Sequence, residues 1–242
     1  MFKIALDAGH GINTPGKRCL KAIDKNETHE WWLNDRICDK VEHELKSYDG
    51  YSLIRVDDTT GKTDVPLAER VRKANNYNAN IYLSVHHNAG VNGGSGGGII
   101  SIAYTTASAK SKEYQKLIYN KLIEETGLKG NRSTPLPLQN LYVCRETSMP
   151  AVLVECGFMD STTDVPIILT EAFADGCAEA LASALVEIGG LKKIEVPKPI
   201  ETNGKIYRVQ VGAYSVKANA EAMQKKLKAD GYDAVIVQGV LT

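Results

Sequence analysis

Two histidines and a glutamate stand near the ends of three short apolar runs in this sequence. His10 follows the run 2–8, His86 lies near the end of 81–88, and Glu155 lies near the end of 151–157. Imidazole and carboxylate groups bind divalent metals and transfer protons, and a catalytic zinc site usually takes three such ligands and keeps a fourth position open. If these ends converge in the fold, the sequence predicts a metal hydrolase site.

The apolar runs also predict the elements that would bring these residues together. They are rich in Val, Ile and Leu and flanked by helical patterns, which is typical of buried strands. Strands and helices alternate along the chain, so we expect an α/β fold with a layered, mostly parallel, twisted sheet and helices on both faces. In open α/β sheets, ligands bind outside the carboxyl ends of the strands. His10, His86 and Glu155 should therefore meet at one sheet edge.

Periodicity and turn residues predict the remaining elements of the first 190 residues. Further strands are expected at 51–56, at 99–104 and, as a short piece, near Leu141. The expected helices are one with Leu33, Ile37, Val41 and Leu45 on its apolar face, and three more at 66–77, 108–126 and 172–188.

The third metal ligand must come from a neighbouring element, and the first helix offers one. Glu30 lies three residues before Leu33, so it shares the helix face that packs on the sheet. A carboxylate buried there needs a partner or a metal to offset its desolvation. Glu27, one turn earlier, is the competing choice. His86 and His87 are adjacent and point to opposite faces of a strand, so spacing alone does not choose between them.

Each candidate has a simpler interpretation when it is taken alone. His10 could be a loop or capping residue, Glu30 a solvated carboxylate stabilised by the helix dipole, and Glu155 a buried ion-pair partner. Cys156, beside Glu155, could be a nucleophile, but we favour a buried core side chain because cysteine is among the most buried residue types. The metal-site hypothesis depends on the coincidence of four such residues at one sheet edge.

Composition argues against several other classes of protein. The chain has 242 residues, enough for one sizeable domain and a small second one. Lys and Arg number 29, as do Asp and Glu, so charge gives no indication of nucleic-acid binding or of an electrostatic membrane patch. No apolar stretch is long enough to cross a bilayer. The 5 cysteines include no Cys-x-x-Cys pair, which argues against a disulfide framework or a structural zinc knuckle.

The C-terminal part is predicted to be separate. A Pro-containing, charged stretch at 191–204 is typical of a linker between a domain at 1–190 and a segment at 205–242. Within that segment we expect strand 206–211, helix 217–230 and strand 234–237. A single β-α-β unit of this size is too small to bury a stable core, so it needs a partner.

Four sequence blocks resemble the signature of a known family. They are Asp7-Ala8-Gly9-His10-Gly11, Glu30 with Asn34 four residues on, Ser84-Val85-His86-His87-Asn88-Ala89, and Val152-Leu153-Val154-Glu155-Cys156-Gly157-Phe158. In this order over residues 1–190, the blocks resemble those of zinc-dependent N-acetylmuramoyl-L-alanine amidases. These enzymes are the bacterial autolysins, sporulation lysins and phage endolysins that cut peptidoglycan.

The resemblance implies a role for each candidate residue. It makes His10, Glu30 and His86 the ligands of Zn²⁺, selects His86 over His87, and makes Glu155 the catalytic glutamate. It also implies hydrolysis of the amide bond between N-acetylmuramic acid and L-alanine of the stem peptide, with zinc-activated water and Glu155 as general base. His87 departs from the family, in which a small residue is common there.

Two rival functions stay open at this level. One is a zinc peptidase that cuts within the stem peptide, and the other is a non-catalytic cell-wall-binding protein. The presence of Glu155 beside all three ligands argues against the second. Two nearby roles are also open: Asp7 either orients His10 or forms the turn, and Gly93–Gly98 either borders the groove or is a loose connection.

The C-terminal segment resembles one repeat of a SPOR domain, a module that binds septal peptidoglycan. The likeness rests on 207–215, 218–220 and 231–234. SPOR domains normally contain two such β-α-β repeats, and only one is present here. We therefore expect peptidoglycan as the partner and a homodimer in which two chains pair residues 205–242 into one complete domain.

The beginning of the chain gives an expectation about location. Met1 leads directly into a strand pattern, without the basic start, apolar core and cleavage site of a signal peptide. We therefore expect synthesis in the cytoplasm without a signal peptide, and action on the cell wall after holin-type or lysis release, as a phage endolysin or a mother-cell lysin in sporulation.

Overall fold

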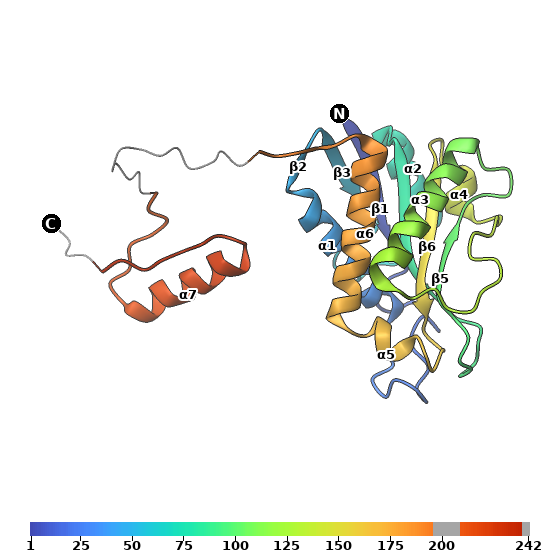
Figure 1. Cartoon of the computed structure of the whole chain (residues 1–242), viewed down its shortest axis with the longest axis horizontal. Helices are drawn as coiled ribbons and strands as arrows, with labels where there is room; N and C mark the ends of the chain where they lie inside the picture. The colour runs from blue at the N-terminus through green and yellow to red at the C-terminus, as the bar shows by residue number, and fades with distance from the viewer. Residues whose placement is uncertain (196–208, 239–242) are drawn as a thin grey trace. The chain divides into compact units, whose positions relative to one another are not determined.

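The computed structural model describes residues 1–195 and 209–238, and it divides the chain into two compact units, Met1–Glu195 and Val196–Thr242 (Figure 1). Each unit is considered by itself. The predicted linker at 191–204 lies mostly outside the described residues, and the predicted domain boundaries stay predictions.

A five-stranded sheet forms the centre of the first unit. Its strand order is β3 (Tyr51–Arg55), β1 (Phe2–Ala8), β4 (Ile81–Asn88), β6 (Ala151–Phe158) and β5 (Ile99–Ile102). The first four strands are parallel, and β5 pairs with β6 in the antiparallel direction. This confirms the predicted α/β class with a mostly parallel sheet. The carboxyl ends of β1, β4 and β6 consequently lie side by side.

Helices cover both faces of this sheet (Figure 1). On one face, α1 (Glu30–Leu45) and α3 (Ala109–Thr126) pack against α6 (Glu171–Gly189), and the short α5 (Val165–Ile168) precedes α6. On the other face lie α2 (Leu67–Tyr77) and α4 (Tyr142–Glu146). The expected apolar face of the first helix is fully buried in the larger core, through Leu33, Ile37, Val41 and Leu45.

Helix ends follow from local sequence. The Ser108 side chain accepts a hydrogen bond from the Ser111 amide and caps α3, and Thr170 caps α6 in the same way. Gly190 ends α6 with a left-handed φ of 60°, a conformation that glycine adopts without steric cost. A two-stranded antiparallel pair, β2 (Tyr48–Asp49) with β7 (Lys192–Lys193), joins the segment after α6 to the segment after α1.

The prediction of a short strand near Leu141 is wrong. Leu141 is the extended residue before α4, and its carbonyl oxygen accepts a hydrogen bond from the Arg145 amide. Tyr and Val favour strands, but here Val143 and Cys144 are buried in the core beneath α2, and this packing outweighs the local preference.

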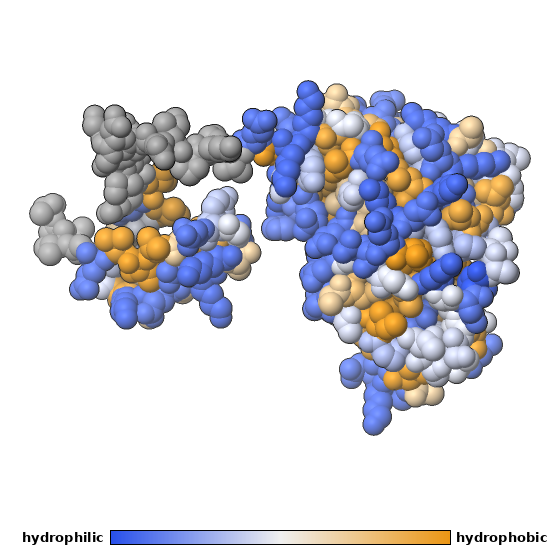
Figure 2. Space-filling model, in the orientation of Figure 1, coloured by the Kyte–Doolittle hydropathy of each residue, from blue (hydrophilic) through white to orange (hydrophobic). Residues whose placement is uncertain are grey.

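In the second unit, α7 (Lys217–Ala229) agrees with the predicted helix, but the two flanking strands are not found among residues 209–238. Residues 234–237 have no strand partner there, and residues 206–208 of the other predicted strand lie outside the described part. None of the α7 residues is buried. Apolar side chains lie at the surface of this unit (Figure 2), among them Val209, Val235 and Val237.

Within residues 1–195 and 209–238, no helix combines the length and apolarity that crossing a bilayer requires.

Candidate metal centre

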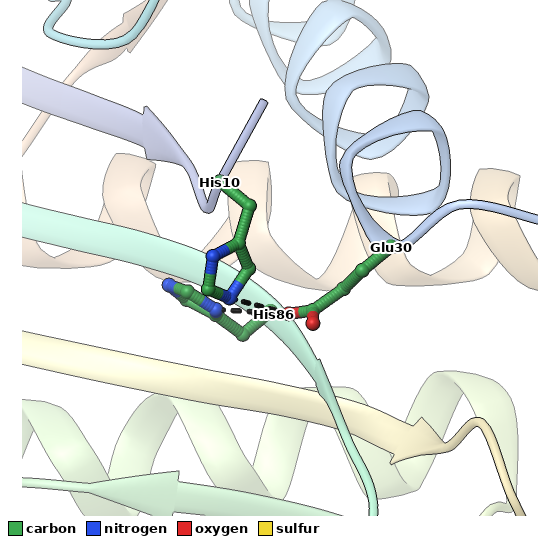
Figure 3. Close-up of side chains that lie close together, drawn as sticks. All are labelled: His10, Glu30 and His86. Carbon is green, nitrogen blue, oxygen red and sulfur yellow. Dashed lines mark hydrogen bonds and ion pairs between the residues drawn. The ribbon is translucent and has the colours of Figure 1, made fainter. Parts of the chain in front are cut away.

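Three side chains from three different elements point toward one another at the carboxyl edge of the sheet (Figure 3). His10 lies two residues beyond the end of β1, Glu30 is the first residue of α1, and His86 lies in β4. Each offers one ligand atom, and these atoms all lie within 4.8 Å of one another. The structure therefore places together the three residues that the sequence singles out as ligands.

The Glu30 carboxylate is the centre of this cluster. Its Oε1 lies 3.0 Å from His86 Nδ1 and 3.4 Å from His10 Nε2. Burial by itself would raise the pKa of Glu30, but the hydrogen bonds from the two imidazoles outweigh it and hold the pKa below its usual range. The same pairing raises the pKa of His86 against the opposing effect of burial. The carboxylate is thus ionised and lies between two ring nitrogens.

The donor set fits a zinc ion. Two imidazole nitrogens and one carboxylate oxygen are ligands that zinc takes in catalytic sites. The Glu30 side chain is 1% exposed, and its Oε2 has no hydrogen-bond partner among the described residues, with only the Lys17 ammonium at 3.7 Å. A buried carboxylate oxygen without a hydrogen bond is costly, and a cation beside it would remove that cost.

Glu155 lies beside the cluster without forming an ion pair in it. In the sheet register, Glu155 on β6 is the partner of His86 on β4, so the two side chains share one face. Burial raises the pKa of Glu155 to about 7, while the neighbouring His86 opposes the rise. Its Oε2 is buried and has no hydrogen-bond partner among the described residues. A carboxyl group in this state is suited to accept and return a proton near neutral pH.

A groove of about 470 Å³ opens over these residues. His10, His86 and Glu155 line it together with Lys17. Its remaining walls come mainly from α2, α4, the segments before them and β6. Their apolar residues are Val65, Pro66, Leu67, Leu141, Tyr142, Val143 and Leu153. The groove can therefore hold a substrate with both polar and apolar parts directly over the metal cluster.

Sequence reasoning missed Arg70, which holds the His10 turn in place. His10 has a left-handed φ of 69°, a conformation that costs a non-glycine residue about 1–3 kcal/mol. The guanidinium of Arg70, 1% exposed, donates to the carbonyl oxygens of Ala8 at 2.7 Å and His10 at 2.9 Å. These bonds offset the strain. The only sequence signal is an arginine on the buried face of a helix.

Asp7 is linked to His10 through Arg70 and not by a direct hydrogen bond between the described side chains. Its carboxylate accepts hydrogen bonds from Arg70, from the Tyr82 hydroxyl at 2.8 Å and from the Ser84 hydroxyl at 2.6 Å. Burial would raise the pKa of Asp7, but the Arg70 charge and the Ser84 hydrogen bond outweigh it and lower that pKa. Asp7 is 1% exposed at the base of the groove, and its hydrogen bond with Arg70 connects it to the His10 turn.

The glycine-rich loop is not among the residues that line the described groove. Gly98 donates its amide to Asp164 at 2.7 Å, and Gly97 donates to Asn131 at 3.2 Å. These hydrogen bonds hold the loop against the segments around 128–131 and 158–164. The two roles considered for Gly93–Gly98 stay predictions, and the loop is tied by hydrogen bonds to the buried Asp164 and the exposed Asn131.

The competing candidates lie elsewhere. Glu27 has a side chain one-third exposed and pairs with Lys21 at 3.0 Å. Cys156 is fully buried. Its hydrogen bond with the Cys177 thiol is the largest cause of a pKa well above the usual range, and burial is the second. Such a thiol is expected of a core side chain rather than a nucleophile. His87 is 2% exposed and turns away from the cluster toward Asn34.

Comparisons with known proteins agree with this geometry. Residues 4–187 match the model of a family described as N-acetylmuramoyl-L-alanine amidase, and residues 178–240 match the SPOR domain. A sporulation-specific N-acetylmuramoyl-L-alanine amidase of Bacillus subtilis (strain 168) is 32% identical over 239 residues, covering 98% of this chain and 85% of that protein. The endolysin of Bacillus phage SPP1 is 32% identical over 190 residues, or 78% of this chain and 66% of the endolysin.

Solved structures show the same fold. The crystal structure of an N-acetylmuramoyl-L-alanine amidase from Clostridium difficile 630 superposes with a TM-score of 0.69 at 27% identity, covering 77% of this chain and 95% of that one. The catalytic domain of CwlV from Bacillus (Paenibacillus) polymyxa var. colistinus gives 0.67 at 26% identity, over 77% of this chain and 97% of that one.

Proposed function

Because this chain belongs to the N-acetylmuramoyl-L-alanine amidase family and is an amidase that acts on peptidoglycan, we propose that His10, Glu30 and His86 hold a zinc ion and that Glu155 moves the proton in hydrolysis. One observation carries the proposal: two imidazoles and a carboxylate converge within 4.8 Å, and Glu155 lies opposite His86 on the next strand.

The three ligands come from three elements that the core holds firmly. Three protein ligands leave an open coordination position, which distinguishes catalytic from structural zinc sites. The chemistry that zinc supplies when bound at such a site is acidification of a water molecule and polarisation of the scissile carbonyl group. The chain's own contribution is to hold the ligands in place, with Arg70 securing the His10 turn and the Glu30 helix start buried.

Glu155 is the carboxyl group next to the cluster that lines the groove and is not one of the three proposed ligands. Its Oε2 has no hydrogen-bond partner among the described residues, and the side chain lines the groove. In the proposed reaction it takes a proton from the attacking water and returns it to the nitrogen of the leaving L-alanine. The bond is the amide between the lactyl group of N-acetylmuramic acid and L-alanine.

The test is mass spectrometry of wall fragments released by the wild-type protein and by Glu155→Gln. We expect fragments with a new L-alanine amine from the wild type and almost none from the variant, while both proteins hold one equivalent of zinc. New amines within the stem peptide would instead identify a peptidase. Zinc binding without release of any fragment would identify a wall-binding protein.

For the C-terminal unit we propose binding of peptidoglycan glycan and pairing between two chains. The SPOR match begins at residue 178, but residues 178–189 belong to α6, where Ala178, Leu181 and Leu185 are buried in the amidase core. The tail is therefore shorter than the SPOR match, and α7 has no buried residue in the described part. A second copy of the tail is the partner with a matching apolar surface.

Light scattering of the full chain and of a protein ending at Glu195 tests the pairing. The shorter protein keeps the whole first unit, including β7. We expect a dimer for the full chain and a monomer for the truncated one; two monomers would overturn the pairing. Sedimentation with glycan strands stripped of stem peptides tests binding separately, because only the full chain should sediment with them.

A further inference from the structure

A single buried amide links the three segments that carry the cluster. Asn34 is fully buried on α1, one turn after Glu30. Its Nδ2 donates to the carbonyl oxygen of Gly9, the residue before His10, at 3.1 Å and lies 3.5 Å from Glu30 Oε1. Its Oδ1 lies 2.8 Å from Nδ1 of His87, the residue after His86. Asn34 therefore contacts Glu30 itself and the chain neighbours of both histidines.

The hydrogen bonds determine which atoms carry hydrogen. Carbonyl and carboxylate oxygens accept, so the Asn34 group that faces Gly9 and Glu30 must be its NH₂. Its oxygen then faces His87, and the hydrogen of this second bond is on His87 Nδ1. The His87 backbone amide also donates to Glu30 Oε1, at 3.2 Å. His87 thus reaches Glu30 by two routes, one direct and one through Asn34.

We propose that Asn34 and His87 form a positioning unit that holds the Glu30 carboxylate and the ends of β1 and β4 at the spacing a metal ion requires. This inference rests on the proposed zinc site. It assigns a role to His87, which faces away from the cluster and does not line the groove.

The physical reason is that the hydrogen bonds described for the Glu30 carboxylate all reach one oxygen, Oε1. Its side chain has several rotatable bonds, and its Oε2 has no hydrogen bond among the described residues. Partners of this kind, which orient the ligands themselves, typically change metal affinity about 10- to 100-fold when they are removed. The unit also has a cost, because Nε2 of His87 is buried without a partner in the described part of the chain. Packing alone would be served better by an apolar residue.

Zinc affinity of the full chain, measured by competition with a chromophoric chelator, tests the proposal. We expect Asn34→Ala and His87→Ala each to weaken zinc binding by about 10- to 100-fold. The double variant should be little weaker than Asn34→Ala alone, because both changes break the same hydrogen bond. His87→Gln, whose side-chain amide can still donate to Asn34, should recover part of the affinity. Melting of the metal-free proteins is measured in parallel.

Cys38→Ala is the matched control. Cys38 lies one turn beyond Asn34 on the same helix and is also fully buried, but no hydrogen bond in the described residues links it to the cluster. This variant should lower the melting temperature and leave zinc affinity unchanged. Unchanged zinc affinity in Asn34→Ala and His87→Ala would overturn the positioning unit. Should Asn34→Ala not fold, the comparison of His87→Ala with His87→Gln decides. A wild-type chain that binds no zinc would instead refute the metal site.

Discussion

Glu30 and Glu155 carry the same chemical group at the same edge of the sheet, yet their surroundings move their pKa values in opposite directions. Burial raises the pKa of Glu155 to about 7, while the hydrogen bonds from His10 and His86 outweigh burial and lower the pKa of Glu30. Two carboxyl groups whose surroundings separate their pKa values are the usual mark of divided roles in an active site. One stays charged as a ligand, and the other exchanges a proton.

The change Glu155→Gln should therefore remove hydrolysis without removing the metal. A glutamine has nearly the same shape but cannot accept the proton, so we expect kcat to fall by about 10²- to 10⁴-fold. Release of soluble wall fragments measures the rate, and metal analysis confirms the zinc content. Glu27→Gln, at the partly exposed carboxylate paired with Lys21, is the control and should keep full activity. Full activity in Glu155→Gln would contradict the assigned role.

The buried ion pair between Asp7 and Arg70 leads to a prediction about the stability of the folded protein. Asp7→Asn leaves the buried Arg70 guanidinium with only one carboxylate, the partly exposed Asp64 at 3.1 Å, which should cost about 3–5 kcal/mol in the free energy of unfolding. Urea denaturation measures this. Asp175→Asn removes a more exposed pair with Lys40 and should cost less than about 1 kcal/mol. Equal effects in the two variants would show that the buried pair has no special role.

At the scale of elements, the cluster exists because parallel strands end side by side. Gly9 lets the end of β1 approach β4 closely: a Cβ added at Gly9 would overlap the His86 ring. Gly9→Ala should therefore displace the His86 imidazole and remove both zinc binding and activity. Gly176→Ala, in α6, meets only ordinary contacts and should be neutral or stabilise the helix by about 0.5–1 kcal/mol. Zinc binding by Gly9→Ala at wild-type affinity would contradict this account.

The sequence predicts much of this arrangement because its signals are local. Apolar runs locate β1, β4 and β6, and four-residue spacing locates the buried face of α1 with Glu30 on it. The choice between His86 and His87 could not be made in this way. Side chains alternate along a strand, so the two histidines face opposite sides of the sheet, but the alternation does not tell which side carries the groove.

The contacts that the sequence does not reveal join residues far apart in the chain. Arg70 holds a turn 60 residues earlier, and Asp7 binds Tyr82, 75 residues later. Neither contact leaves a periodic pattern. The prediction of a strand near Leu141 is wrong for a related reason. Packing beneath α2, rather than the local preference of the sequence, makes α4 a helix.

At the scale of the whole molecule, metal binding should increase the free energy of unfolding of the first unit. A ligand that binds only the folded state at about 1,000 times its Kd adds about 4 kcal/mol. Chelation should therefore lower the melting temperature of the full chain and of the protein ending at Glu195 by similar amounts. Glu30→Gln, which weakens the cluster at its centre, should melt at the same temperature with and without chelator. A chelator effect that persists in Glu30→Gln would place the metal elsewhere.

All five cysteines are free and buried in the first unit: Cys19, Cys38, Cys144, Cys156 and Cys177. Thiol reagents react with the exposed thiolate, and burial raises the pKa of Cys19 and Cys144 to about 12. The cysteines of the native protein should therefore not react with maleimides until the core unfolds. Its labelling rate reports that opening directly. One cysteine introduced at an exposed position, such as Lys110, would accept a fluorophore without removal of the native five.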